Sequence, residues 1–125
     1  MDLKFGQDKK LKSRKRIENL FAEGNRFSKF PITAVYFFDR QRPESYKIAV
    51  SVPKKKIRKA VERNLIKRRI REVFRLNQHK LKPDCGLEVM FIFTGNELLS
   101  FAVIEKSILF LIDSLNSVSA DDTSA

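Results

Sequence analysis

Residues 57–77 read IRKAVERNLIKRRIREVFRLN, and the expected fold depends on this stretch. It contains no Pro or Gly and many residues of high helix propensity, so it predicts the longest helix of the chain. At about 100° per residue, one stripe of this helix is polar and the opposite side is apolar. The polar stripe consists of Asn64, Lys67, Arg68, Arg71 and Arg75. The apolar side consists of Ile66, Ile70, Val73 and Phe74. We therefore expect a helix that packs on a sheet with one side and presents a row of cations to solvent with the other.

Strands are expected on both sides of this helix. Residues 46–52 alternate apolar and polar side chains, which is typical of a strand with one buried face, and Pro53 ends the run. Residues 87–94 are almost all apolar, as expected for a strand that is covered on both faces. Together with the helix between them, these strands predict a crossover unit, whose handedness and strand order the pattern leaves open.

Three further elements complete the expected architecture. Residues 30–38 predict another strand. Apolar residues at helical spacing predict one helix over 13–24 and another that starts between Asn96 and Phe101 and extends to Leu115. This order of elements is typical of an α+β sandwich, in which a mainly antiparallel sheet is covered by helices.

The length of 125 residues fits a single domain with its own core. We expect this domain over residues 1–116, with a loose basic arm over 1–10 and a disordered tail over 117–125. The lone Cys85 excludes an internal disulfide, and no apolar run has the length of a membrane span or the pattern of a secretory signal. These features predict a cytoplasmic protein that does not enter a membrane.

Charge is distributed unevenly along the chain. The net charge is +11, but residues 1–82 contain 25 Lys or Arg against 8 Asp or Glu, whereas residues 83–125 contain 1 against 7. Residues 54–82 alone hold 13 of the 26 cations, opposed only by Glu62 and Glu72. Guanidinium groups can bind two phosphate oxygens at once, and few acids stand at helical spacing to pair with them. A nucleic acid is therefore the expected partner, ahead of an acidic membrane surface or a merely solvated helix face.

An enzyme that cleaves nucleic acid with its own side chains would need a general base or metal ligands near the phosphate. The only histidine, His79, lies in a polar stretch, and no pair of carboxylates has the spacing of metal ligands, since Asp121 and Asp122 stand in the expected tail. We therefore expect no catalytic and no metal-ligating side chain. A ribosomal or architectural nucleic-acid-binding protein is the alternative class of binding module.

Residues 60–75, AVERNLIKRRIREVFR, resemble the signature helix of the bacterial ribonuclease P protein component, with the pattern Arg-Asn-x-x-Lys-Arg-x-x-Arg. The preceding VSVPKK at 50–55 resembles the strand and the Lys-Lys turn of that family, and residues 11–24 resemble its N-terminal helix. The resemblance extends over about residues 11–115.

This resemblance implies a fold like the second domain of ribosomal protein S5, a sandwich of a four-stranded sheet and helices with a left-handed βαβ crossover. It also implies a protein cofactor of an endoribonuclease, whose RNA subunit uses Mg²⁺ to remove the 5′ leader of precursor tRNA and leaves a 5′ phosphate. The implied partners are ribonuclease P RNA and precursor tRNA, with no further protein required. No cofactor is expected on the protein itself.

The resemblance further implies two groups of contact residues. Those for the catalytic RNA lie on or just before the signature helix: Lys54, Lys55, Arg58, Arg63, Asn64, Lys67, Arg68, Arg71 and Arg75. Those for the leader lie in a cleft between the sheet and the first helix, and comprise Phe21, Tyr36 and Phe37. Unstacked bases need such flat partners. Because residues 30–38 are apolar on both sides, the pattern leaves open whether Tyr36, Phe37 or Phe38 faces the cleft.

Overall fold

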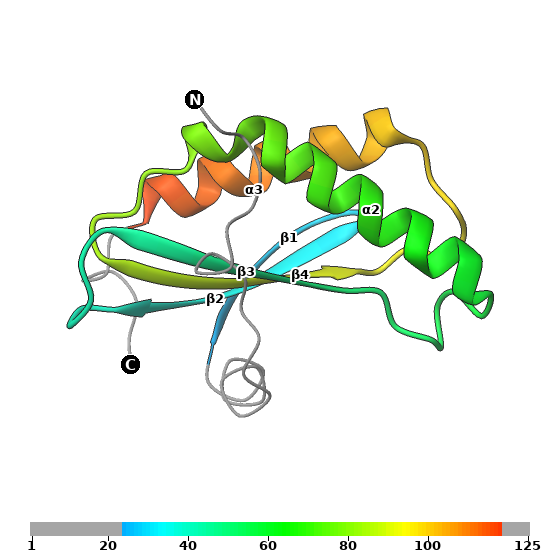
Figure 1. Ribbon diagram of the computed structural model, residues 1–125, viewed down its shortest axis with the longest axis horizontal. Helices are drawn as coiled ribbons and strands as arrows, with labels where there is room; N and C mark the ends of the chain where they lie inside the picture. The colour runs from blue at the N-terminus through cyan, green and yellow to red at the C-terminus, as the bar shows by residue number, and fades with distance from the viewer. Residues whose placement is uncertain (1–23, 119–125) are drawn as a thin grey trace.

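The computed structural model of the protein describes residues 24–118, which form a four-stranded sheet with two long helices on one of its faces (Figure 1). The strands are β1 (Asn25–Lys29), β2 (Ile32–Asp39), β3 (Ser45–Ser51) and β4 (Gly86–Phe93). The helices are α2 (Ala60–Asn77), the short 3-10 helix η2 (Gln78–Lys80) and α3 (Phe101–Ser117). The arm expected over 1–10, nearly all of the helix expected over 13–24, and residues 119–125 of the expected tail lie outside the described residues.

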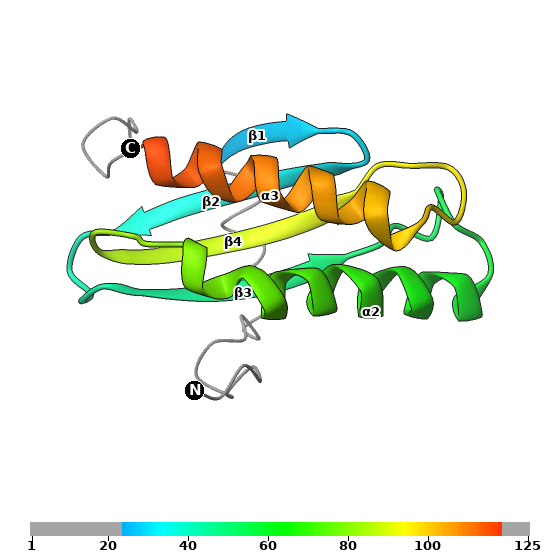
Figure 2. The same cartoon turned by 90° about the horizontal axis from the view of Figure 1, so that it is seen from above.

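The strand order in the sheet is β1-β2-β4-β3. β2 pairs antiparallel with β1 and with β4, whereas β3 pairs parallel with β4. The α+β class with a four-stranded sheet is thus confirmed, and so is the crossover unit around α2. Figure 2 shows the sheet from the side of the helices, with β3 and β4 running horizontally and α2 in front of them. If the picture is turned so that both strands point upward, β4 lies to the left of β3. The crossover is therefore left-handed, as the family resemblance implies.

α2 packs on the sheet through the apolar side that its sequence predicts. Its buried residues are Ile66, Ile70, Val73 and Phe74. The ring centroid of Phe74 lies 5.6 Å from that of Phe91 in β4 and 5.7 Å from that of Tyr46 in β3. α3 contributes Ile104, Ile108, Leu111, Ile112 and Leu115 to the same core. This shared core determines which side of α2 faces solvent.

The other side of the sheet, here called the second sheet face, consists of alternate residues of β2, β3 and β4. In the strand register these are Thr33, Val35 and Phe37 of β2, Glu88, Met90 and Ile92 of β4, and Lys47, Ala49 and Ser51 of β3. Val35 and Met90 are buried and form a small apolar cluster with Ala49 and Ile92. β4 is therefore apolar or buried on both faces, as its sequence predicts.

The first two strands differ from the sequence-based expectation. The pattern does not reveal β1, because its letters NRFSK are mostly polar, and it exists as an edge strand through its pairing with β2. The strand expected over 30–38 begins at Ile32 instead, because Phe30 and Pro31 form the turn between β1 and β2.

Both long helices begin at positions set by local hydrogen bonds. α2 begins at Ala60, three residues later than expected, because the chain first makes a turn in which Pro53 O accepts from the N–H of Ile57 at 3.2 Å. α3 begins at the last position of the expected interval, where the Ser100 side chain accepts a hydrogen bond from the N–H of Val103 at 3.3 Å.

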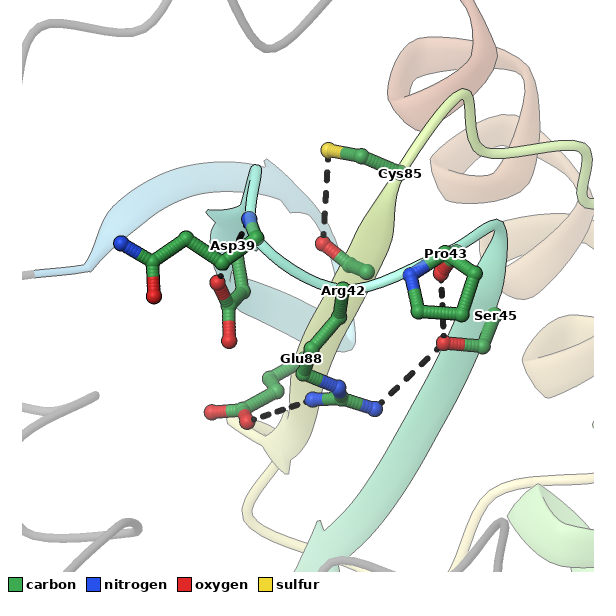
Figure 3. Close-up of polar contacts among 8 residues, drawn as sticks. Asp39, Arg42, Pro43, Ser45, Cys85 and Glu88 are labelled. Carbon is green, nitrogen blue, oxygen red and sulfur yellow. Dashed lines mark hydrogen bonds and ion pairs between the residues drawn. The ribbon is translucent and has the colours of Figure 1, made fainter.

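An arginine holds the connection between β2 and β3 against the start of β4 (Figure 3). The Nη1 atom of Arg42 lies 3.0 Å from Oε2 of Glu88, whose side chain is only 4% exposed. The backbone of Arg42 accepts a hydrogen bond from the N–H of Gly86 at 3.2 Å. A Cβ atom on Gly86 would lie 2.7 Å from Cβ of Arg42, so this close approach requires glycine. These contacts hold the first residues of β4 in place.

Candidate nucleic-acid interface

A turn with three exposed lysines precedes α2. Lys54, Lys55 and Lys56 are exposed, and the N–H of Lys56 donates to Pro53 O at 3.0 Å. The residues on either side of the turn, Val52 and Ile57, are buried in the core. The core therefore anchors both ends of the turn and keeps its ammonium groups in solvent. Lys56 was not among the expected contact residues, although the run of three lysines contains it.

The side of α2 opposite to the buried residues presents polar and cationic groups to solvent. Asn64, Arg68 and Arg71 are exposed, and Lys67 and Arg75 are half-buried. Asn64, Arg68, Arg71, Glu72 and Arg75 line an open groove of about 410 Å³ along the helix. We call this set the α2 groove. A groove of this composition offers planar guanidinium groups to an anionic ligand.

One cation of the α2 groove is paired within the protein. Arg75 donates from Nε to Oε2 of Glu72 at 3.1 Å and from Nη2 to Oε1 at 2.5 Å. These hydrogen bonds, together with the charge of Arg75, hold the pKa of the Glu72 carboxyl below its ordinary range against the opposing effect of burial. Between residues 24 and 118, neither Arg68 nor Arg71 forms an ion pair, although Arg68 stands one turn before Glu72. Their charges therefore remain available to a ligand.

Two other arginines of α2 make contacts inside the molecule. Nη1 of Arg63 donates to the carbonyl oxygens of Ile57 and Arg58, at 3.0 and 2.7 Å. Nη1 of Arg69 donates to Leu99 O at 2.5 Å and so ties α2 to the segment before α3. Arg63 was expected to contact RNA, and its guanidinium also holds residues 57 and 58 against the first turn of the helix. Arg58 itself is exposed.

Tyr36 and Phe37, two of the aromatic residues expected in the leader cleft, lie on opposite faces of the sheet. Tyr36 points to the side of the helices, is 5% exposed, and stacks on Phe27 with 5.1 Å between ring centroids. Phe37 points to the second sheet face and is 37% exposed. Phe38 shares the core with Tyr36, and Phe21 lies outside the described residues. Among Tyr36, Phe37 and Phe38, only Phe37 has a partly exposed ring on the second sheet face that a base could contact.

Comparison with known proteins identifies the family to which this arrangement belongs. A family model described as Ribonuclease P matches residues 5–116. The ribonuclease P protein component of Porphyromonas gingivalis is 34% identical over 111 residues, which cover 82% of this chain and 81% of that protein. The component of Mycoplasma genitalium is 32% identical over 115 residues, covering 92% and 87%. The chain belongs to the bacterial ribonuclease P protein family.

Solved structures of ribonuclease P proteins have the same fold. The Staphylococcus aureus protein superposes with a TM-score of 0.71 at 19% identity, covering 85% of this chain and 94% of that one. The Thermotoga maritima protein superposes with a TM-score of 0.69 at 22% identity, covering 84% and 96%. As a ribonuclease P protein, the chain is a subunit of a tRNA-processing endoribonuclease that works as a ribonucleoprotein with ribonuclease P RNA.

The described part of this ribonuclease P protein shows no metal centre. Between residues 24 and 118, no group of three or more His, Cys, Asp or Glu side chains could hold a metal ion. His79 is exposed in η2. Among the helices described, none combines the length and the apolar character needed to span a bilayer. The expectation that the protein supplies no catalytic side chain stays a prediction.

Replacing Tyr36 by phenylalanine should make the protein more resistant to alkaline unfolding. Burial raises the pKa of the Tyr36 phenol above its ordinary value of about 10. The stabilising effect of the raised pKa is therefore complete below about pH 10 and is lost as the pH rises toward the pKa of the folded state. Chemical denaturation of both proteins at pH 8 and above pH 10 measures this: the Tyr36→Phe protein should lose less unfolding free energy over that interval, and an equal loss would contradict the expectation.

Proposed function

We propose that α2 and the lysine turn before it bind folded ribonuclease P RNA, and that the protein acts as a cofactor while the RNA performs the hydrolysis with Mg²⁺. The supporting observation is that Arg68 and Arg71 are exposed and form no ion pair in the described residues, on a helix whose other side is buried against the sheet. Unpaired guanidinium groups repel one another, so a polyanion lowers the free energy of this surface.

The lysine turn lies close to the α2 groove in the chain, with residues 57–63 between them. Lys54, Lys55 and Lys56 precede the first residue of the helix by four to six positions, and the groove residues extend over three turns of it. Because Arg63 ties residues 57 and 58 to the first turn of α2, the two cationic groups keep a fixed geometry. A rigid row of cations suits a folded RNA, whose phosphates are also held at fixed positions.

The cofactor role is tested by combining the purified chain with its cognate ribonuclease P RNA and a precursor tRNA at low Mg²⁺. The chain alone should leave the precursor intact, and its addition to the RNA should accelerate removal of the 5′ leader. The accelerating effect should fall steeply with salt, because each neutralised phosphate releases counterions. Efficient leader removal by protein free of RNA would contradict the proposal.

We further propose that the second sheet face binds the single-stranded leader. Phe37, Glu88 and Lys47 are neighbours across β2, β4 and β3 in the strand register. Phe37 offers a partly exposed ring for stacking, and Lys47 is a cation on the same face. Aromatic rings interleaved with cations are the usual composition of sites for single-stranded RNA.

Replacing Phe37 by alanine should reduce the preference for precursor tRNA over leaderless tRNA by about fivefold to tenfold, the effect of losing one stacked base. The measurement is the ratio of the two dissociation constants for the assembled protein–RNA complex. Phe110→Ala is the matched control, because Phe110 is an aromatic residue of α3 with 48% exposure. An unchanged ratio in the Phe37→Ala protein would exclude Phe37 from the leader site.

A further inference from the structure

The α2 groove contains one carboxylate among its arginines. Glu72 lines the groove together with Asn64, Arg68, Arg71 and Arg75. Its side chain is 43% exposed, although both of its oxygens accept hydrogen bonds from Arg75. A groove that binds only phosphate would be better served by a neutral residue at this position, because a carboxylate repels phosphate oxygens.

The ionisation of Glu72 determines which kind of ligand group it can bind. Its lowered pKa means that the carboxyl is ionised at neutral pH, so it can accept hydrogen bonds but cannot donate one. Each carboxylate oxygen has two lone pairs, and Arg75 uses one on each oxygen. Glu72 therefore retains the capacity to accept from a ligand, and the ligand group must be a donor.

RNA has a donor close to its phosphates that DNA lacks. The ribose 2′-hydroxyl donates as well as accepts, and it is displayed along the wide minor groove of an RNA helix next to the phosphate backbone. A ligand that places phosphates on Arg68 and Arg71 thus brings 2′-hydroxyl groups to the neighbouring turn of α2. DNA would bring a C–H group to the same place, and the lone pairs of the carboxylate that Arg75 does not use would then have no donor.

We propose that Glu72 accepts a hydrogen bond from a ribose 2′-hydroxyl of the bound RNA, and that it makes the α2 groove selective for RNA over DNA. The inference rests on the proposed binding of ribonuclease P RNA by α2 and names the group on the RNA that Glu72 reads. Glu72 is then a specificity-determining residue, whereas Arg68 and Arg71 supply affinity without regard to the sugar.

The test uses ribonuclease P RNA in which 2′-deoxynucleotides with cleavable phosphorothioate tags replace a few random positions. RNA bound by the full-length protein is separated from unbound RNA, and iodine cleavage shows which 2′-deoxy positions are depleted from the bound fraction. The unaltered protein should show depletion of about fivefold to tenfold at one or more positions, as expected for a lost hydrogen bond to a charged group. In the Glu72→Ala protein, one or two of these positions should no longer be depleted.

Three further variants separate recognition from indirect effects. Glu72→Gln keeps an acceptor oxygen and should keep the depletion. Arg75→Ala should weaken binding of all RNAs but keep the depletion, because it leaves the carboxylate in place. Glu97→Ala, which removes an exposed carboxylate outside α2, should change nothing.

The possible results distinguish this inference from the proposed function. If the unaltered protein fails to bind ribonuclease P RNA, or binds it without dependence on salt, the proposed function is wrong and the inference with it. If binding is as proposed but the 2′-deoxy pattern is identical with and without Glu72, only the inference is wrong. The inference alone is also wrong if the Glu72→Ala and Arg75→Ala proteins lose the depletion at the same 2′-deoxy positions. Glu72 would then act only by holding Arg75.

Discussion

Replacing Arg68 and Arg71 together by alanine is expected to weaken binding of ribonuclease P RNA by about 10-fold to 100-fold at moderate salt, since each removes a charge-assisted contact to phosphate. The plot of log affinity against log salt concentration should become less steep by about 2, one for each lost phosphate contact. The fold should remain intact, because both side chains point away from the buried side of α2.

Affinity is measured by filter binding or fluorescence anisotropy at several salt concentrations, and the fold is checked by thermal unfolding. The matched control replaces Lys80 and Lys106, two exposed lysines outside α2, so that net charge falls by the same amount. If the control weakens binding as much as the Arg68 and Arg71 pair, the protein attracts RNA only through its net charge. Unfolding of the Arg68 and Arg71 variant would contradict the assignment of these side chains to the solvent side.

Replacing Phe74 by alanine should lower the free energy of unfolding by about 3–5 kcal/mol, the usual range for a buried phenylalanine. Phe74 is fully buried, and its ring contacts those of Phe91 and Tyr46 in the two parallel strands. A loss of this size is a large part of the total stability of a domain, about 5–15 kcal/mol. The variant tests whether packing of α2 on the sheet holds the cationic face in place.

Urea denaturation measures the effect, with two controls on the same helix. Phe74→Leu preserves most of the volume and should cost less than about 1.5 kcal/mol. Leu76→Ala, at a residue with 39% exposure, should change stability by less than about 0.5 kcal/mol. A small loss for Phe74→Ala would mean that the interface between α2 and the sheet contributes little. Below its unfolding transition, the Phe74→Ala protein should keep the salt dependence of RNA binding, because its cations are unchanged.

The fold could be predicted from the sequence wherever one segment has a strong pattern of its own. The apolar side of α2 and the nearly continuous apolar run of β4 are such segments, and the structure confirms both. β1 could not be predicted, because its mostly polar letters become a strand only through pairing with β2. The same holds for the close approach of Gly86 to Arg42, which depends on residues 44 positions apart in the chain.

The candidate interface could be predicted in outline but not in its internal contacts. Helical periodicity alone indicates that Arg68 and Arg71 face solvent, because the buried residues define the opposite side. Periodicity cannot tell which cations bind carbonyl oxygens of distant segments, as Arg69 does with Leu99 O. It also cannot orient an apolar strand: alternation places Tyr36 and Phe37 on opposite faces, but only the structure shows that Tyr36 faces the helices and Phe37 faces away from them.

Tethered cleavage can show whether the solvent side of α2 lies against ribonuclease P RNA. Val61 is 80% exposed and stands seven residues before Arg68, hence within about 20° of it around the helix. Val61→Cys therefore places an iron–EDTA group on the cationic side without removing a charge, and Val103→Cys places it on α3 at 41% exposure. The native Cys85 is buried and should not react.

Hydroxyl radicals from position 61 should cut ribonuclease P RNA strongly at a few sites, while those from position 103 should cut it weakly. Strong cutting from position 103 with little from position 61 would mean that α3, and not the solvent side of α2, lies against the RNA.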